Sequence, residues 1–314
     1  MSVDGLNFLD ALEPRIVMFC GKGGVGKTTC ASTTALHFAL KGKRTLLIST
    51  DPSPSLSDML ETDVMGCVRT VASACLDAVE LDYDRIVDLW KEKFGDEVYD
   101  VVSSFLPVER DIIDYIAGAP GIGDEFALSY VYDLYVSGAY DVIVWDTAPA
   151  GGTLSLLKLE DTFYRHLGEA ARLYVKVRAA LNALAQGKPR DPLKIIGEWQ
   201  RLAHDVLSMT KDARTMALMV TIPEALSVSQ TRRVAGELER FGVHIGGLVI
   251  NQVLTEEASD SPFNRSRREM QIRHIRDLET AFTGEVPQVK LPLQSFEVRG
   301  VETLRKMERL LFPC

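Results

Sequence analysis

The sequence predicts an α/β fold, with a doubly wound, mostly parallel sheet and an inserted α-helical subdomain. Three observations predict it. A glycine-rich loop stands between an apolar run at residues 15–20 and a helical pattern at 28–40. Further short apolar runs each end in a polar residue, as strands of a parallel sheet do. Two long stretches carry apolar residues at three- and four-residue spacing. We expect a single domain over 1–314, with the helical subdomain at about 83–137 and 156–211.

The glycine-rich loop is Gly21-Lys22-Gly23-Gly24-Val25-Gly26-Lys27-Thr28, followed by Thr29. It fits the pattern G-x-x-x-x-G-K-[ST], in which backbone N–H groups and a helix N-terminus converge on phosphate oxygens. Lys27 then places a positive charge on the β- and γ-phosphates, and Thr28 offers a hydroxyl to Mg²⁺. The strand and helix patterns on either side support a phosphate loop over a chance glycine-rich turn.

Composition narrows the class of protein. The chain has 314 residues and a net charge of −9, which argues against broad binding to nucleic acid. We find no run of about 18 apolar residues and no signal-peptide pattern, so a membrane span is not expected. The five cysteines are scattered and form no C-x-x-C pair. This usage is typical of a reducing cytoplasm, and it predicts no zinc site.

Three further apolar runs end in candidate site residues. Asp51 follows the run at 45–50, Asp146 ends the run at 140–145, and Asn251 follows the run at 246–250. Ligands of open parallel sheets lie beyond the carboxyl ends of the strands, so Asp51 should face the phosphates. A strand-terminal aspartate such as Asp146 commonly holds Mg²⁺ through water. Thr28, Asp51 and Asp146 are therefore the candidate metal-site residues, although Asp51 could instead cap a helix and Asn251 could be a turn residue.

Three segments together resemble one family. Lys22 gives the loop the form K-G-G-V-G-K-T-T, residues 51–58 are D-P-S-P-S-L-S-D, and residues 146–154 are D-T-A-P-A-G-G-T-L. These segments are similar to the deviant phosphate loop, switch I and switch II of the ATPases that target tail-anchored membrane proteins and of the related arsenite-pump ATPases. The resemblance covers nearly the whole chain in order. Ser53-Pro54-Ser55 and Gly152 depart from it, because the family has a histidine in each switch.

The resemblance implies roles for the predicted site. The substrates would be ATP and Mg²⁺, with Lys27, Asp51 and Lys22 as the catalytic residues. Asp51 would orient or deprotonate the attacking water, and Lys22 would reach the phosphates bound by a partner subunit. Asn251 would recognise the adenine edge, and Pro292 lies in a segment, 289–300, that resembles the family's loop beside the base. Where many members carry a C-x-x-C that binds zinc, this chain has Ser261-Pro262-Phe263-Asn264.

The same resemblance implies partners. We expect a homodimer that binds and shields the transmembrane helix of a tail-anchored client and delivers it to a membrane receptor. The helical stretches at 83–137 and 156–211 would form the apolar surface for that client, although such stripes are more often core. One alternative is an arsenite- or antimonite-pump-type ATPase that energises a membrane partner. Another is a nucleotide-switched positioning ATPase that binds a membrane or scaffold through its last helix, 301–314.

Overall fold

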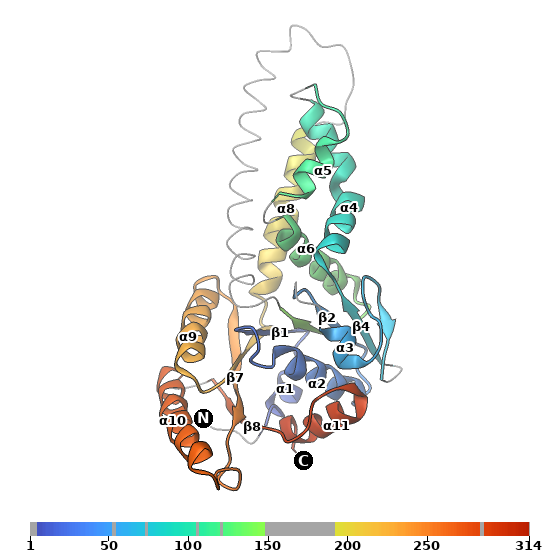
Figure 1. Cartoon of the computed structure of the whole chain (residues 1–314). Helices are drawn as coiled ribbons and strands as arrows, with labels where there is room; N and C mark the ends of the chain where they lie inside the picture. The colour runs from blue at the N-terminus through green and yellow to red at the C-terminus, as the bar shows by residue number, and fades with distance from the viewer. Residues whose placement is uncertain are drawn as a thin grey trace. The chain divides into compact units, whose positions relative to one another are not determined.

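The computed structural model describes residues 5–51, 55–72, 75–104, 107–119, 122–147, 192–282 and 286–313. The chain divides into two compact units (Figure 1). The sheet unit comprises Met1–Asp82, Leu134–Leu154 and Thr210–Cys314, and the helical unit comprises Tyr83–Asp133 and Ser155–Met209. Most of the second predicted helical stretch, 156–191, lies outside the described residues, as do Gly152 and the rest of 148–154.

The sheet unit is built on one sheet with the strand order β3-β4-β2-β5-β1-β6-β7-β8. Its strands are β1 (Ile16–Gly21), β2 (Thr45–Ser49), β3 (Arg69–Thr70), β4 (Leu76–Glu80), β5 (Val142–Asp146), β6 (Thr215–Thr221), β7 (His244–Val253) and β8 (Gln288–Pro292). All neighbouring pairs are parallel except β3 with β4. The predicted α/β class with a mostly parallel sheet is therefore confirmed.

Helices cover the sheet because its central strands are apolar on both faces. Val17 and Phe19 of β1 belong to one core cluster with residues of α2 (Lys27–Leu40) and α11 (Gly300–Leu311). The alternate residues Ile16 and Met18 are also buried and point to the other face. The remaining helices of this unit are α1 (Phe8–Leu12), α3 (Leu56–Leu60), α9 (Ala225–Arg240), which packs on β1, β6 and β7, and α10 (Pro262–Ala281).

A buried histidine connects three of these helices. His37 of α2 contacts Glu308 of α11 through Nδ1 at 2.8 Å and Asp10 of α1 through Nε2 at 3.1 Å. Its ring also stacks on Phe312, with centroids 3.6 Å apart. The backbone N–H of Leu6 donates to the carbonyl of Leu311 at 2.6 Å. The first and last described segments are thus packed together on α2.

The helical unit has its own apolar interior. It contains α4 (Tyr83–Ser103), α5 (Ile112–Ala117) and most of α6 (Ile122–Ser137) and α8 (Pro192–Thr210). Trp90 and Phe126 each lie 6.2 Å from Phe94, centroid to centroid. Trp199 of α8 donates from Nε1 to Glu97 of α4 at 2.8 Å. The four aromatic side chains of this group border a cavity of about 200 Å³ with an almost wholly apolar lining.

Several elements differ from the expected ones. The segment 289–300 is expected as a loop, but residues 289–292 belong to β8, because Val289 and Leu291 bury their side chains while the strand pairs with β7. β7 continues through Asn251 and Gln252 to Val253. Its register with β8 shifts there, and Gln252 adopts a left-handed φ of 57°. The short elements α1, α3 and β3 carry no periodic pattern long enough to predict. Within the described ranges, no helix is long and apolar enough to cross a membrane.

Candidate nucleotide-binding site

Most of the predicted site residues meet at one cavity beyond the carboxyl ends of the strands. This cavity encloses about 600 Å³. Its lining includes nine residues that the sequence predicts, namely Gly23, Gly24, Gly26, Lys27, Thr28, Thr29, Asp51, Asn251 and Pro292. It also includes Ser55, Met59, Gln252, Leu293, Gln294, Phe296, Val298 and Met307. The phosphate-loop side is polar, and the side formed by the segment between β8 and α11, together with Met307 of α11, is largely apolar, as a site for phosphates and a base requires.

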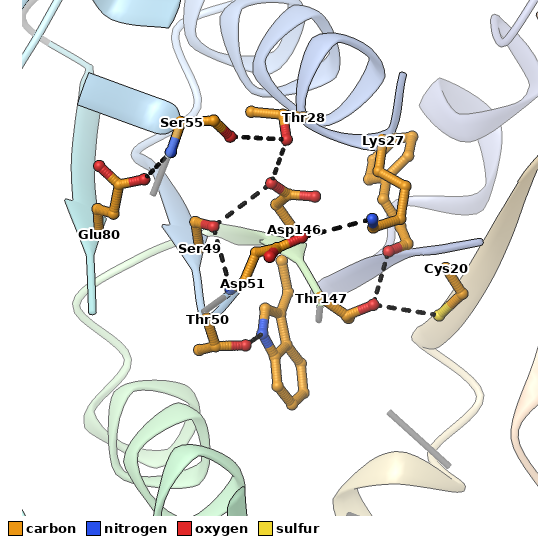
Figure 2. Close-up of polar contacts among 12 residues, drawn as sticks. Cys20, Lys27, Thr28, Ser49, Thr50, Asp51, Ser55, Glu80, Asp146 and Thr147 are labelled. Carbon is orange, nitrogen blue, oxygen red and sulfur yellow. Dashed lines mark hydrogen bonds and ion pairs between the residues drawn. The ribbon is translucent and has the colours of Figure 1, made fainter. Parts of the chain in front are cut away.

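Lys27 and Asp51 form an ion pair across this cavity. Lys27 is the first residue of α2, and Gly26 before it has a φ of +95°, which a residue with a Cβ adopts only with strain. The Lys27 ammonium lies 3.5 Å from Oδ2 of Asp51 (Figure 2). Both side chains are nearly buried, with exposed fractions of 4% and 11%. The loop therefore fixes the ammonium beside the carboxylate that the sequence places at the end of β2.

Asp146 lies beneath Thr28 at the end of β5. The Thr28 hydroxyl donates to Oδ2 of Asp146 at 2.7 Å, and the Ser49 hydroxyl lies 3.4 Å from the same oxygen (Figure 2). Burial raises the pKa of Asp146 from 3.8 to about 6, and the nearby Asp51 adds to this. The hydrogen bond from Thr28 and the charge of Lys27 oppose the rise. A cation in this position would lower the pKa again by favouring the ionised form.

The Thr28 and Asp146 pair fits a Mg²⁺ site. Oδ1 of Asp146 is buried and has no hydrogen-bond partner among the described residues. A carboxylate oxygen in that state needs a water or a cation. Hydroxyl and carboxylate oxygens are the ligands that Mg²⁺ prefers, commonly with water between metal and aspartate. Asp51 contacts Lys27 instead, so its assignment to the metal site stays a prediction.

Two further bonds hold the ends of the central strands together. The Thr147 hydroxyl donates to the carbonyl of Phe19 at 2.8 Å, which joins the end of β5 to β1. The indole N–H of Trp145 donates to the Thr50 hydroxyl at 3.0 Å, which joins β5 to the end of β2. Figure 2 shows Thr50, Asp51, Asp146 and Thr147 gathered at these strand ends. The two aspartates are therefore placed by the sheet itself.

Asn251 packs directly on the phosphate loop. Its Nδ2 donates to the carbonyl of Val25 at 2.9 Å, and its Oδ1 accepts from the backbone N–H of Gln252 at 2.9 Å. A Cβ added at Gly26 would lie 2.3 Å from that Nδ2. A flipped amide would face a carbonyl with its oxygen and an N–H with its nitrogen, so the orientation is fixed. One N–H and one lone pair remain for a ligand.

The other predicted residues have different positions. Gly21 ends β1, and Val25 is buried behind the loop. Lys22 is half-buried, does not line the cavity, and its ammonium forms no ion pair or hydrogen bond with the described residues. Its predicted contact with phosphates bound by a second subunit stays a prediction, as do the roles of Asn251 and Pro292 at the base.

Sequence reasoning missed several functional contacts. Glu80, at the end of β4, accepts hydrogen bonds from the start of α3. The Ser55 hydroxyl lies 3.4 Å from that of Thr28. Gln271 of α10 accepts from the N–H of Leu254 at 2.8 Å and donates to the carbonyl of Gln252 at 3.0 Å, which stabilises the irregular end of β7. A glutamate ending an apolar run was the one available signal for Glu80.

A parallel sheet with a phosphate loop, an adjacent lysine–aspartate pair and a buried strand-terminal aspartate defines a phosphate-loop nucleotide hydrolase. The chain belongs to the family described as anion-transporting ATPase, whose sequence model matches residues 14–313. As a member of this family, the protein is an ATPase.

Named relatives resemble most of the chain. ATPase GET3C of Arabidopsis thaliana is 32% identical over 317 residues, which cover 93% of this chain and 81% of the relative. ATPase get3 of Pyrenophora tritici-repentis is 30% identical over 317 residues, covering 97% and 93%. A relative from Aquifex aeolicus, whose name refers to an arsenical pump-driving ATPase, is 30% identical over 304 residues, covering 95% and 99%. The predicted family is confirmed, and both branches of it occur among these names.

Proposed function

We propose that this protein is an ATP-hydrolysing, homodimeric targeting factor that shields the transmembrane helix of a tail-anchored protein and delivers it to a membrane. The observation that carries the proposal is a second, apolar cavity in the helical unit, for which ATP hydrolysis alone has no use. Relatives named GET3 at about 30% identity over most of the chain support the same assignment.

In this proposal the chemistry is positioning and charge. The N–H groups of the loop and the Lys27 ammonium bind the phosphates. In binding them, the ammonium gives up its ion pair with Asp51. The Asp51 carboxylate is then able to accept a hydrogen bond from the attacking water and take its proton. Thr28 and Asp146 would hold Mg²⁺, which supplies positive charge to the phosphate oxygens. A correctly placed base contributes about 10²–10⁴ to the rate.

Base recognition is assigned to Asn251. Its free N–H and lone pair match the N7 acceptor and N6 amino group of adenine, which an amide contacts in a bidentate manner. Guanine presents two acceptors at the same edge, so one would face the amide oxygen. The carbonyl of Val25 and the N–H of Gln252 prevent the amide from turning to suit guanine. This arrangement favours ATP over GTP.

The client site is assigned to the helical unit. Trp90, Phe94, Phe126 and Trp199 give its cavity an aromatic lining suited to apolar side chains. A transmembrane helix is about 30 Å long, which exceeds what one cavity of this size covers. A dimer that joins two such surfaces is the receptor we propose. Lys22 supports this dimer, because its ammonium is not used by the described part of its own chain.

Capture of a client tests the proposal. Asp51→Asn should bind ATP without hydrolysing it and should co-purify with a co-expressed protein bearing one carboxy-terminal transmembrane segment. Asp63→Asn is the matched control, since Asp63 is exposed and accepts a bond from the N–H of Met65 that an asparagine preserves. The control should hydrolyse ATP at the normal rate. Stimulation of turnover by arsenite, together with failure to capture any such segment, would favour the pump-driving alternative instead.

A second pair of variants tests the client cavity separately from hydrolysis. Val101→Glu places a charge in the lining of the cavity, whereas Tyr115→Glu places it on a side chain that is 81% exposed in the same unit. We expect Val101→Glu to lose the client while keeping basal ATP hydrolysis. Tyr115→Glu should keep both. Equal capture by the two variants would remove the client assignment.

The positioning alternative requires the last helix to meet a membrane or scaffold. Leu304, Met307 and Leu311 of α11 are buried against the sheet unit, and α11 packs on α2. The apolar face of this helix is therefore used in the core. Deletion of residues 301–314 should cause aggregation, whereas release of a folded protein from lipid would support the alternative.

A further inference from the structure

The carboxylate of Glu80 is fully engaged by the beginning of α3. Glu80 is the last residue of β4, lies opposite Ser49 of β2 and is 1% exposed. Oε1 accepts from the backbone N–H groups of Ser55 and Leu56 at 2.6 and 2.7 Å. Oε2 accepts from the N–H of Ser57 at 3.0 Å and from its hydroxyl at 2.8 Å. Figure 2 shows the carboxylate of Glu80 facing the backbone nitrogen of Ser55.

These bonds replace the usual cap of a helix. The side chain of Ser55, at the N-cap position, accepts no capping bond, so the first N–H groups of α3 depend on a residue of another element. The backbone of Glu80 is itself fixed. Its N–H donates to Val64 at 2.9 Å, and its carbonyl accepts from Gly66 at 2.8 Å. A buried carboxylate needs several donors, and the N-cap Ser55 with the first two residues of α3 supplies four of them.

The anchored end of α3 lies next to the reacting groups. The Ser55 hydroxyl is 3.4 Å from that of Thr28, which in turn bonds Asp146. Ser55 and Asp51 both line the nucleotide cavity, and they bound the connection between β2 and α3. The end of β2 places Asp51, and Glu80 holds the backbone of Ser55. Nothing in the phosphate loop contacts Glu80 directly among the bonds of the described residues.

We propose that Glu80 is a positioning residue for ATP hydrolysis, which holds the start of α3 so that Ser55 keeps its place beside Thr28 at the nucleotide cavity. This inference rests on the proposed hydrolysis of ATP at this cavity, with Thr28 beside the metal. Nucleotide is bound by the loop between β1 and α2, which Glu80 does not touch, so its loss should affect turnover more than binding. Misplacement by about 1 Å is enough to cost about 10²-fold in rate.

Glu80→Gln is the direct test, because the amide keeps the shape but faces N–H groups with its nitrogen. We expect kcat for ATP to fall about 10²-fold. The dissociation constant for ADP with Mg²⁺, measured by equilibrium titration, should change by less than about threefold, a small difference in free energy. Ser57→Ala removes one of the four bonds and should give an intermediate kcat, which keeps the test available if Glu80→Gln folds poorly.

Asp77→Asn is the matched control. Asp77 lies on the same strand and accepts side-chain bonds from Thr70 at 2.7 Å and Tyr140 at 3.0 Å, away from the cavity. It should lower thermal stability without lowering kcat. The proposal is overturned if Glu80→Gln keeps its kcat, if Asp77→Asn lowers kcat as much, or if kcat and ADP affinity fall together.

Asp51→Asn, assayed in parallel, separates this proposal from the proposed function. If Asp51→Asn keeps its turnover, the proposed role of Asp51 is wrong, and the kcat of Glu80→Gln alone decides the inference about Glu80. If Asp51→Asn is inactive and Glu80→Gln is fully active, only the positioning role of Glu80 is wrong.

Discussion

Replacement of Asp146 by asparagine should stabilise the protein at neutral pH when nucleotide and metal are absent. Asp146 is fully buried, and burial raises the pKa of its carboxyl group from 3.8 to about 6. An ionised carboxylate in that position is therefore costly. Asparagine has nearly the same shape and keeps an oxygen that accepts the hydrogen bond from Thr28.

The magnitude follows from the difference in pKa between folded and unfolded states. A shift from 3.8 to about 6 is worth about 3 kcal/mol, at about 1.4 kcal/mol for each pH unit. Between about pH 4 and pH 6 the folded state holds a proton that the unfolded state has released. The contribution of Asp146 to the free energy of unfolding is therefore fully present below about pH 4 and is lost as the pH rises through about 6.

Urea unfolding of both proteins in EDTA, between pH 4 and pH 7.5, measures this contribution. The free energy of unfolding of the variant, relative to the unmutated protein, should rise by about 3 kcal/mol from pH 4 to pH 7. The same variant should lose Mg²⁺-dependent ATP turnover. Asp141→Asn is a control for which we expect the opposite effect on stability at neutral pH, because hydrogen bonds from Arg44 lower the pKa of Asp141. Its variant should lose stability at neutral pH and not at low pH.

A difference between Asp146→Asn and the unmutated protein that stays constant from pH 4 to pH 7 would refute this reasoning. So would a variant that becomes relatively less stable as the pH rises. Either result would mean that Asp146 is ionised in the folded protein at little cost, and that its buried oxygen is satisfied without a cation.

Three more substitutions test the geometry of the sheet unit. Gly26→Ala should abolish ADP binding in a titration, because its φ of +95° and a 2.3 Å approach to Asn251 leave no room for a Cβ; retained affinity would contradict this. Asn251→Ala should reduce the preference for ATP over GTP by about tenfold, one good amide–base pair being worth about 1–3 kcal/mol. Unchanged discrimination in competition binding would show that another group selects the base. His37→Gln should lower the free energy of unfolding by about 2–4 kcal/mol in urea, because Asp10 and Glu308 lose their shared partner. An unchanged free energy of unfolding would show that the carboxylates of Asp10 and Glu308 are stabilised by water and not by His37.

The site residues could be predicted where a short stretch of sequence is enough to identify them. Gly26, Lys27 and Thr28 stand in one short motif whose backbone shape is set by glycine, and strand ends reveal themselves when an apolar run stops at Asp51 or Asp146. The parallel order of the strands then brings these ends to one edge, so no further information is needed to place them together.

Contacts between distant segments were not predictable in this way. The bond from Asn251 to Val25 joins residues 226 positions apart and depends on how far β7 extends past its apolar run. Glu80 contacts Ser55 only because β4 is the neighbour of β2. A single sequence gives the period of each strand but not its neighbour, so pairing must come from the tertiary structure.

The packing of α2 against α11 has a consequence for synthesis of the chain. His37 meets Glu308 only after 271 further residues have been added, which takes roughly 15–50 s at ordinary elongation rates. Until then the apolar side of α2 that α11 covers stays exposed, although the strands under α2 were synthesised earlier. The side of the nucleotide cavity that Met307 lines is therefore formed only once α11 has been synthesised.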